Sequence, residues 1–427
     1  MQIRRVHVVN SEIASIPFVF PFGASIRMGY LLAGIASSSA LLAQQPEVLP
    51  NQGLPIYSNP FRTKPSTVDN TDVGSSSIGL PSAKSRSLID VIRLTSMPPH
   101  IESPVITAIS VSPNGDLIAA AGDDHVIRIV DLKTGKTQAT LVGHLDWVQS
   151  VEFSPNGLQL ASCGNDGILL VWTLGSSPRM IAKKSVKHAL MTLTFLDDDR
   201  IYLAGFSNRI YQYRADQSEL SVVHACDCRD IRSIVASPDR KWIAFGGRDG
   251  VLRVRPVDLA QQAESNVQER SLHSESANEI AVPLHFERIR TLQFSTDGNQ
   301  ITSVGEDRRI VHYDLVHRAV VGQSEIGGGK LLGLCQLDTH LFAIAGSDNT
   351  IRIFSDTDKQ VLAKLVGHDG SVSILKRTQK HLISGSFDTT IRIWDIERAI
   401  ATLDNQGRYV HPVAAQFEDS GAGAEVR

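Results

Sequence analysis

The stretch that decides the fold lies near the end of the chain and reads Ile383-Ser384-Gly385-Ser386-Phe387-Asp388-Thr389-Thr390-Ile391-Arg392-Ile393-Trp394-Asp395. In it a turn aspartate is followed by an apolar position and then by an aromatic–Asp pair. The same phrase recurs upstream, with its turn position at Asp124, Asp166, Ser207, Asp249, Asp307, Asp348 and Asp388. The spacings are 42, 41, 42, 58, 41 and 40 residues, which predicts seven copies of one structural repeat.

Each copy carries strand and turn signals. The run Val148–Phe153 alternates, meets a turn at 154–157 (Ser-Pro-Asn-Gly), and resumes at Leu158. Proline second and glycine fourth are favoured in a type I turn, and the same turn recurs at 112–115. We expect about four short antiparallel strands per repeat, too few to bury their own faces. The one long spacing indicates an insertion, mostly 260–283, whose Ser, Glu and Gln content suits a surface loop.

These repeats resemble the WD-repeat family. Gly143-His144 and Gly367-His368 match the family's Gly-His pair, and Trp394-Asp395 matches its Trp-Asp pair. The resemblance covers about residues 87–403 and implies an all-β, seven-bladed β-propeller of four-stranded antiparallel blades. In this family one blade is shared between the termini. We favour 88–94 as the closing strand, because His100 stands where a Gly-His pair would fall; 399–403 is the alternative.

The resemblance also assigns the repeated His and Asp residues a structural role. It implies a buried His–Asp hydrogen bond that locks each blade, extended by a strand hydroxyl (Ser162, Ser384) and a tryptophan. The predicted lock residues are His144, Asp166, His285, Asp307, His368, Asp388, Trp172 and Trp394, with His188 as a further repeat histidine. Repetition supports this reading over catalysis, since a catalytic pair is needed only once. The third repeat has Ser207 for its Asp and the sixth lacks its His, so we expect these blades to be the weakest.

No signature of catalysis, metal or cofactor binding stands out. Cys226-Asp227-Cys228 has no second cysteine pair to complete a zinc site, and the two cysteines could form a bridge or stay free. Cys163 and Cys335 fall in strand patterns and suit a small core residue. The run 327–330 (Gly-Gly-Gly-Lys) lacks the spacing of a phosphate loop. We therefore expect no enzyme, no metal and no cofactor; the alternative is a propeller enzyme or small-ligand binder that uses the central channel.

A partner-binding face follows from the resemblance. In WD-repeat propellers, partners contact the residue before each first strand and the residue before each turn aspartate. This register gives exposed aromatic and basic residues at Trp147, Phe206, Arg248, Arg288, Lys330 and Phe387. Aromatic residues and arginine are enriched in binding hot spots, so we expect a protein or peptide partner. The alternative is that neighbouring loops partly bury the three rings.

Composition agrees with a globular interaction protein. The 427 residues are 42% hydrophobic and 20% charged, with a formal net charge of −3, which argues against a nucleic-acid partner. Four cysteines are too few for a disulfide scaffold. We expect a monomeric propeller.

The first 86 residues differ from the rest. An apolar-to-small run at 31–43 is followed by Gln-Gln-Pro, which fits a secretory signal over 1–43, with Met28 as a possible true start. A start at Met28 would leave no Lys or Arg before the run. Residues 44–86 read as a Pro/Ser/Asn-rich flexible linker and 404–427 as a disordered tail. We expect export to the periplasm or cell envelope with no membrane span after processing; the alternative is a cytoplasmic assembly scaffold.

Overall fold

A computed structural model describes residues 88–95, 102–226, 228, 230–257 and 279–400 of the chain. The expected signal segment (1–43), linker (44–86) and tail (404–427) lie outside these residues, as does His100. Within the described ranges the chain forms 28 strands and one short helix.

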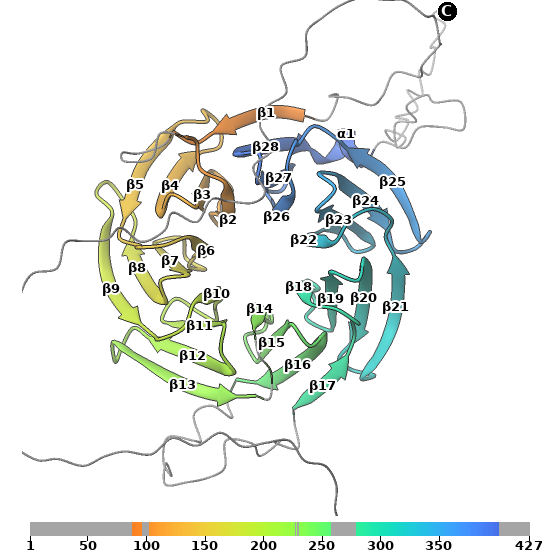
Figure 1. The fold of residues 1–427 in the computed structure, drawn as a ribbon, viewed down its shortest axis with the longest axis horizontal. Coiled ribbons are helices and arrows are strands. Elements are labelled where there is room, and N and C mark those ends of the chain that lie inside the picture. The colour runs from red at the N-terminus through yellow and green to blue at the C-terminus, as the bar shows by residue number, and fades with distance from the viewer. Residues whose placement is uncertain (1–87, 96–101, 227, 229, 258–278, 401–427) are drawn as a thin grey trace, which may run out of the picture. The chain divides into compact units, whose positions relative to one another are not determined.

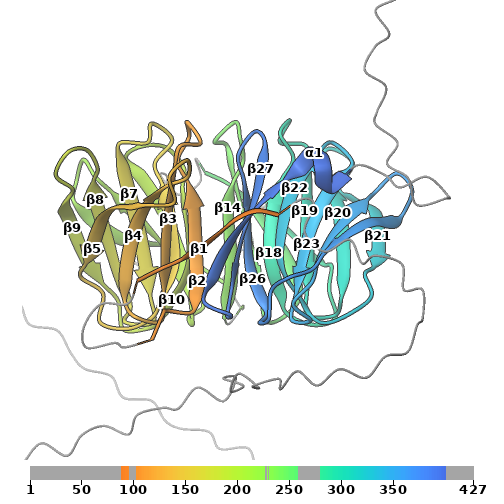
Figure 2. The same cartoon turned by 90° about the horizontal axis from the view of Figure 1, so that it is seen from above.

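The strands form seven four-stranded antiparallel sheets placed radially around a central axis (Figures 1 and 2). The expected seven-bladed propeller is confirmed. In each blade the first strand lies nearest the axis and the last strand lies at the rim (Figure 1). Six blades are continuous in sequence, and the seventh is assembled from both ends of the propeller.

The blades are numbered here by chain order. Blade 1 comprises β2 (Ile106–Val111), β3 (Leu117–Gly122), β4 (Val126–Asp131) and β5 (Thr137–Val142). Blade 2 comprises β6 (Val148–Phe153), β7 (Gln159–Gly164), β8 (Ile168–Thr173) and β9 (Arg179–Ser185). Blade 3 comprises β10 (Leu190–Phe195), β11 (Arg200–Gly205), β12 (Arg209–Arg214) and β13 (Glu219–Ala225). Blade 4 comprises β14 (Ile231–Ala236), β15 (Trp242–Gly247), β16 (Val251–Pro256) and β17 (Ile280–Pro283).

The remaining blades follow the same order. Blade 5 comprises β18 (Ile289–Phe294), β19 (Gln300–Gly305), β20 (Arg309–Asp314) and β21 (Ala319–Glu325). Blade 6 comprises β22 (Leu331–Asp338), β23 (Leu341–Gly346), β24 (Ile351–Ser355) and β25 (Gln360–Leu365). Blade 7 comprises β26 (Val372–Arg377), β27 (His381–Ser386), β28 (Thr390–Asp395) and β1 (Leu88–Arg93).

Blade 7 closes the ring with the N-terminal strand. β1 pairs antiparallel with β28, with Val91 opposite Arg392 and Ile92 opposite Ile391. The alternative closing strand at 399–403 is wrong as far as the structure describes it, because residues 396–400 form the helix α1 (Ile396–Ile400), which contacts β25 and β28.

The long insertion of the fourth repeat ends earlier than expected. Its last four residues form β17, which pairs with β16 and completes blade 4. The surface loop expected over 260–283 therefore does not reach 283. Ile-Ala-Val-Pro supplies a β-branched, apolar strand signal that the surrounding polar residues had masked.

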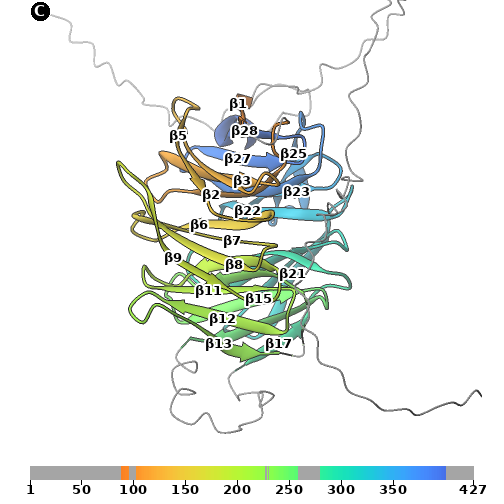
Figure 3. The same ribbon diagram turned by 60° about the vertical axis from the view of Figure 1, so that its left-hand side comes forward.

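The hydrophobic core lies between neighbouring blades, whose stacking is visible from the side in Figure 3. One cluster joins Ala119 and Ile129 of blade 1 to Val151, Phe153 and Leu160 of blade 2, all at most 5% exposed. Strand β8 is buried throughout 168–172, whereas the rim strand β5 alternates toward solvent. Each blade therefore buries its two faces only against other blades. Across the described part of the chain, no helix has the length and apolarity needed to cross a membrane.

Closure by β1 makes a specific prediction. Ile92 is 6% exposed and packs with Ile391 and Ile393 between blades 7 and 1, whereas Ile89 of the same strand is 50% exposed. We expect Ile92→Ala to lower the free energy of unfolding by about 2–5 kcal/mol, the cost of a large-to-small change in a core. Ile89→Ala is the matched control and should leave it nearly unchanged. Equal urea midpoints for the two variants would show that β1 does not hold the ring closed.

Candidate partner-binding face

One end of the propeller carries both sets of residues expected at the partner face. In each blade the chain turns from second to third strand at this end, and in blades 2 to 7 the backbone N–H of the pre-turn residue donates to the carbonyl of the residue before the first strand. Asn165 N donates to Trp147 O at 2.9 Å, Phe206 N to Ala189 O at 2.9 Å, and Glu306 N to Arg288 O at 2.9 Å. We call this end the Asp-turn face. All six predicted face residues lie on it.

Three blades contain the expected His–Asp–Ser arrangement. The His Nδ1 to Asp distance is 2.8 Å for His144–Asp166 and His285–Asp307 and 2.7 Å for His368–Asp388. The His Nε2 lies 2.9, 2.8 and 2.7 Å from the hydroxyls of Ser162, Ser303 and Ser384. All three imidazoles are buried at 5% exposure. Both ring nitrogens of each histidine therefore have a side-chain hydrogen-bond partner.

Blade 7 extends this arrangement to its tryptophan. Trp394 Nε1 donates to Ser384 Oγ at 2.9 Å, which completes a chain of four side chains ending at Asp388. Burial alone would raise the pKa of Asp388, but hydrogen bonds from His368 and Thr390 outweigh burial and hold that pKa well below its usual value. The carboxylate is therefore ionised and fully committed to the blade, leaving it unsuited to proton transfer.

Trp172 of blade 2 departs from the predicted lock. Its indole Nε1 is buried and has no hydrogen-bond partner, although the ring sits at the equivalent register. The ring packs close to Gly143, so its contribution is apolar. The lock of blade 2 consequently ends at Ser162.

Three further blades use arginine where no histidine is present. The turn aspartate pairs with an arginine four residues later: Asp124 with Arg128, Asp249 with Arg253, and Asp348 with Arg352. The contact is 2.6 Å in blade 1, where Arg128 is 2% exposed and also donates to Thr95 O at 2.6 Å. The Asp-x-x-x-Arg spacing at these three turns is a sequence signal for the pairs that our prediction of the locks did not include.

The glycine run at the start of blade 6 leaves room for the Arg352–Asp348 pair. In the locked blades the histidine lies four residues before the first strand, and in blade 6 that position is Gly327. Gly328 adopts φ +107°, and a Cβ there would overlap the Arg352 guanidinium and the Asp348 carboxylate. The Arg–Asp pair thus fills the space next to the backbone. Asp348 in the sixth blade has a buried partner after all, which removes the reason to expect that blade to be weak.

Blade 3 has neither kind of lock. The histidine position is occupied by Val186, whereas His188 lies two residues further on and is exposed. Its buried polar contact is instead a hydrogen bond from Gln212 Nε2 to Tyr202 Oη at 2.8 Å. The prediction that His188 is the equivalent repeat histidine was wrong. Its spacing of 19 residues to Ser207 is shorter than the 20 to 22 residues between histidine and aspartate in the locked blades.

In the sequence of blade 4, the position four residues before the first strand, which holds the histidine in the locked blades, falls between two cysteines. A disulfide joins these cysteines, Cys226 and Cys228. Cys163 and Cys335 are free and buried. Among the residues that the structure describes, no group of three or more His, Cys, Asp or Glu side chains is placed to hold a metal ion.

The predicted aromatic residues differ in exposure. Phe206 is 44% and Phe387 38% exposed, whereas Trp147 is half-buried. Trp147 and Phe387 also line the central cavity, which has a volume of about 670 Å³. Phe206 packs against Arg232, whose Cζ lies 4.6 Å from the ring centroid. Two of the rings therefore face the channel mouth, and the third supports a cation.

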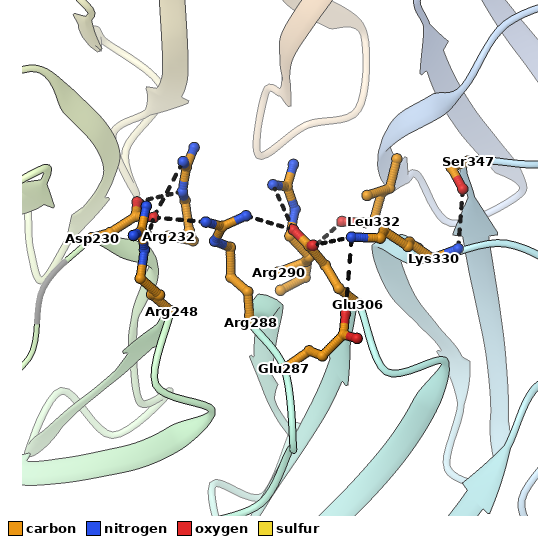
Figure 4. Close-up of polar contacts among 11 residues, drawn as sticks. Asp230, Arg232, Arg248, Glu287, Arg288, Arg290, Glu306, Lys330, Leu332 and Ser347 are labelled. Atoms are coloured by element: carbon orange, nitrogen blue, oxygen red, sulfur yellow. Dashed lines mark hydrogen bonds and ion pairs between the residues drawn. The ribbon is translucent and has the colours of Figure 1, made fainter.

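The predicted basic residues belong to one ion-pair network across blades 4 to 6 (Figure 4). Arg288 lies at its centre, with Nη2 3.1 Å from Asp230 and Nη1 2.8 Å from Glu306. Arg248 lies 3.3 Å from Asp230, and Lys330 Nζ lies 2.6 Å from Glu306. Burial opposes the charges of Arg288 and Glu306, but their partners outweigh it, raising the pKa of Arg288 and lowering that of Glu306. Both groups stay charged.

Five members of the network were not among the predicted site residues. They are Asp230, Arg232, Glu287, Arg290 and Glu306. Arg232 Nε lies 2.5 Å from Asp230, and Arg290 Nη1 lies 3.5 Å from Glu306. The sequence signal was the alternation Asp-Ile-Arg at 230–232 and Arg-Ile-Arg at 288–290, where each first strand begins. Selecting only aromatic and basic residues at two register positions left these residues out.

The cavity inside the ring is lined by the first strands of all seven blades. Arg232 and Arg290 line it near the Asp-turn face, and Glu152 and Lys376 line it toward the other end of β6 and β26. Burial among protein atoms raises the pKa of Glu152 to about 7 despite the opposing charge of Lys376. Arg232 and Arg290 thus lie at the end where the predicted face opens, whereas Arg377 lines the cavity at the other end, beside Lys376.

Comparisons with known proteins agree with this architecture. The family described as "WD domain, G-beta repeat" matches residues 92–131, 135–173, 218–255, 280–314 and 359–395. The chain is 23% identical over 272 residues to the apoptotic protease-activating factor 1 of Danio rerio, covering 61% of this chain and 19% of that protein. It is 24% identical over 275 residues to the ribosome biogenesis protein WDR12 homolog of Drosophila persimilis, covering 61% and 64%. The cell division control protein 4 of Saccharomyces cerevisiae is 41% identical over 63 residues, covering 14% of this chain and 8% of that protein.

The chain thus spans about a fifth of the first relative and less than two thirds of the second. Fold and repeats define a seven-bladed β-propeller in which six blades contain a polar pair at the turn aspartate. The protein belongs to the WD-repeat family, and the resemblance inferred from sequence is confirmed. The matched ranges leave out the first three strands of blade 3, where Ser207 replaces the turn aspartate, and of blade 6.

The difference between Trp394 and Trp172 is testable. Ser384→Ala removes the partner of both His368 and Trp394, whereas Ser162→Ala removes the partner of His144 alone. An unsatisfied buried polar group costs about 1–3 kcal/mol, so we expect Ser384→Ala to cost this much and more than Ser162→Ala. Urea denaturation of both variants measures the difference. A larger loss for Ser162→Ala would contradict the assigned hydrogen-bond chain.

The glycines of blade 6 offer a second matched pair. We expect Gly328→Ala to destabilise the protein by more than about 1 kcal/mol, because its φ is left-handed and its Cβ would displace the Arg352–Asp348 pair. A Cβ at Gly327 would have no atom within 4 Å, so Gly327→Ala should be close to neutral. Thermal melts of the two variants test this, and equal melting temperatures would refute the role assigned to Gly328.

Proposed function

We propose that the propeller is a non-catalytic scaffold that binds a protein or peptide partner across its Asp-turn face. The WD-repeat family supports a scaffold for protein interaction. The observation that carries the site is the gathering of partly exposed aromatic side chains and a fixed ion-pair network around one mouth of the central cavity. Rigid aromatic and arginine side chains supply binding energy at low entropic cost.

The experiment compares two variants of the propeller, each recovered with its bound proteins from the native host. Trp147→Ala combined with Phe387→Ala removes two aromatic residues at the cavity mouth. Leu158→Ala removes an exposed apolar side chain, 65% accessible, from the turn at the opposite end of blade 2. We expect partners held by the wild type and by Leu158→Ala to be lost from the double variant. Unchanged recovery by the double variant, at an unchanged melting temperature, would overturn the assignment of this face.

We further propose that the protein is exported by the apolar run at 31–43 and acts at the cell envelope as a monomer. The support is the sequence of the run, its small residues and the Gln-Gln-Pro that follows. The competing proposal is an intracellular assembly scaffold, favoured by the similarity to a protein named for ribosome biogenesis.

N-terminal sequencing and fractionation of the native protein separate these proposals. Export predicts a mature chain that begins close to residue 44 and is recovered outside the cytoplasm. An N-terminus that still carries the apolar run, on protein recovered from the cytoplasm, would refute export and leave the intracellular scaffold.

A further inference from the structure

The ion-pair network of the Asp-turn face carries a net positive charge. It contains five cationic side chains, Arg232, Arg248, Arg288, Arg290 and Lys330, and three carboxylates, Asp230, Glu287 and Glu306. The surplus of two positive charges (5 − 3) lies within blades 4 to 6 of a chain whose formal net charge is −3. Local charge of one sign beside a cavity attracts ligands of the other sign.

Two guanidinium groups of this network face the cavity. Arg290 has one ion pair among the described residues, the 3.5 Å contact with Glu306, and Arg232 is paired with Asp230 on one side. Both line the cavity. Burial lowers the pKa of Arg290, and the charge of Arg232 lowers it further. Two like charges thus lie near each other with unused donors, an arrangement that an incoming anion would stabilise.

The surrounding side chains hold these cations in place. The Phe206 ring stacks on Arg232, and Asp230 and Glu306 are only 4% and 11% exposed in their side chains. Arg288 joins the two carboxylates and so couples blades 4 and 5 (Figure 4). Because these contacts already hold the cavity-facing guanidinium groups in position, little side-chain entropy is lost when a carboxylate binds them.

The opposite side of the cavity mouth is aromatic. Trp147 belongs to blade 2 and Phe387 to blade 7, on either side of blade 1, whereas the arginines belong to blades 4 and 5 across the ring (Figure 1). A ligand that spans the mouth therefore meets cations at one end and apolar rings at the other. An extended polypeptide that carries carboxylates beside apolar side chains has this distribution of chemistry.

We propose that the cavity mouth binds an acidic segment of a partner protein, with its carboxylates paired to Arg232 and Arg290 and its apolar part on Trp147 and Phe387. This inference rests on the proposed function of the Asp-turn face and names the chemistry of the partner. It assigns Arg232 and Arg290 as the residues that select for negative charge.

The test uses the full chain and fluorescence anisotropy. The probe is a short labelled peptide of alternating Glu and Leu, and its matched control replaces every Glu by Gln. We expect the acidic peptide to bind and the Gln peptide to bind at least about tenfold more weakly, because each charge-assisted contact is lost. Higher salt should weaken the acidic peptide alone, since the contacts lie partly in solvent.

Matched arginine variants locate the site. Arg290→Gln removes a cavity arginine that has one long ion pair, and we expect it to weaken the acidic peptide by about 10- to 100-fold. Arg240→Gln removes an exposed arginine from the turn between β14 and β15, at the opposite end of blade 4, and should not change the affinity. Equal melting temperatures for both variants exclude a folding effect.

Each other outcome overturns the inference. Equal binding of the Gln peptide would show that the site does not select for carboxylates. Equal losses of acidic-peptide affinity in Arg290→Gln and Arg240→Gln would show that the attraction comes from the whole surface and not from the cavity mouth. Preference for a phosphoserine peptide over the Glu peptide would identify a phosphate site instead. None of these results touches the proposed function, which fails only if the Trp147→Ala, Phe387→Ala variant keeps the native partners.

Discussion

A four-stranded blade cannot bury its own two faces, and the rest of this structure depends on that constraint. The inner strands of each blade are apolar on both sides, so each sheet needs a neighbour on either side. A row of such sheets leaves two unsatisfied ends, and closing the row into a ring removes both. Strand β1 completes the last sheet from the other end of the propeller, and its Ile92, together with Leu94 just after the strand, enters the cluster between blades 7 and 1.

Apolar stacking joins neighbouring blades, and within six of the blades a polar pair ties the turn aspartate to another element of the same sheet. Blades 2, 5 and 7 use a histidine before the first strand to bind the turn aspartate and a strand serine. Blades 1, 4 and 6 bind the aspartate with an arginine from the third strand. In blades 1, 2, 5 and 7 the aspartate side chain is at most 8% exposed and would be costly to bury without its partner, whereas Asp249 and Asp348 of blades 4 and 6 are partly exposed. Blade 3, with Ser207 in place of the aspartate, has no carboxylate to satisfy.

The ring also brings charged and aromatic side chains together at one mouth of the central cavity. Residues next to the first strands of different blades are 40 or more residues apart in sequence, yet they converge around one cavity. On blades 4 to 6 this convergence builds the network centred on Arg288, whose carboxylates hold their cations in fixed positions. A rigid frame therefore presents charge on one side and aromatic rings on the other, which suits the selective recognition of a partner.

The sequence by itself determined the number of repeats and the short antiparallel strands of each repeat, because these depend on local pattern and a constant repeat spacing, and the family resemblance added the His–Asp–Ser contacts. It also supported the closing strand, through the apolar and β-branched residues of 88–94. Only the tertiary structure decided which partner each turn aspartate takes. Trp172 and Trp394 occupy the same register, but only Trp394 reaches its serine, because small differences in packing position the indole. The joining of Arg232, Arg288 and Arg290 into one network was likewise set by tertiary packing, because the stacking of blades 4 and 5 brings the starts of their first strands within ion-pair distance.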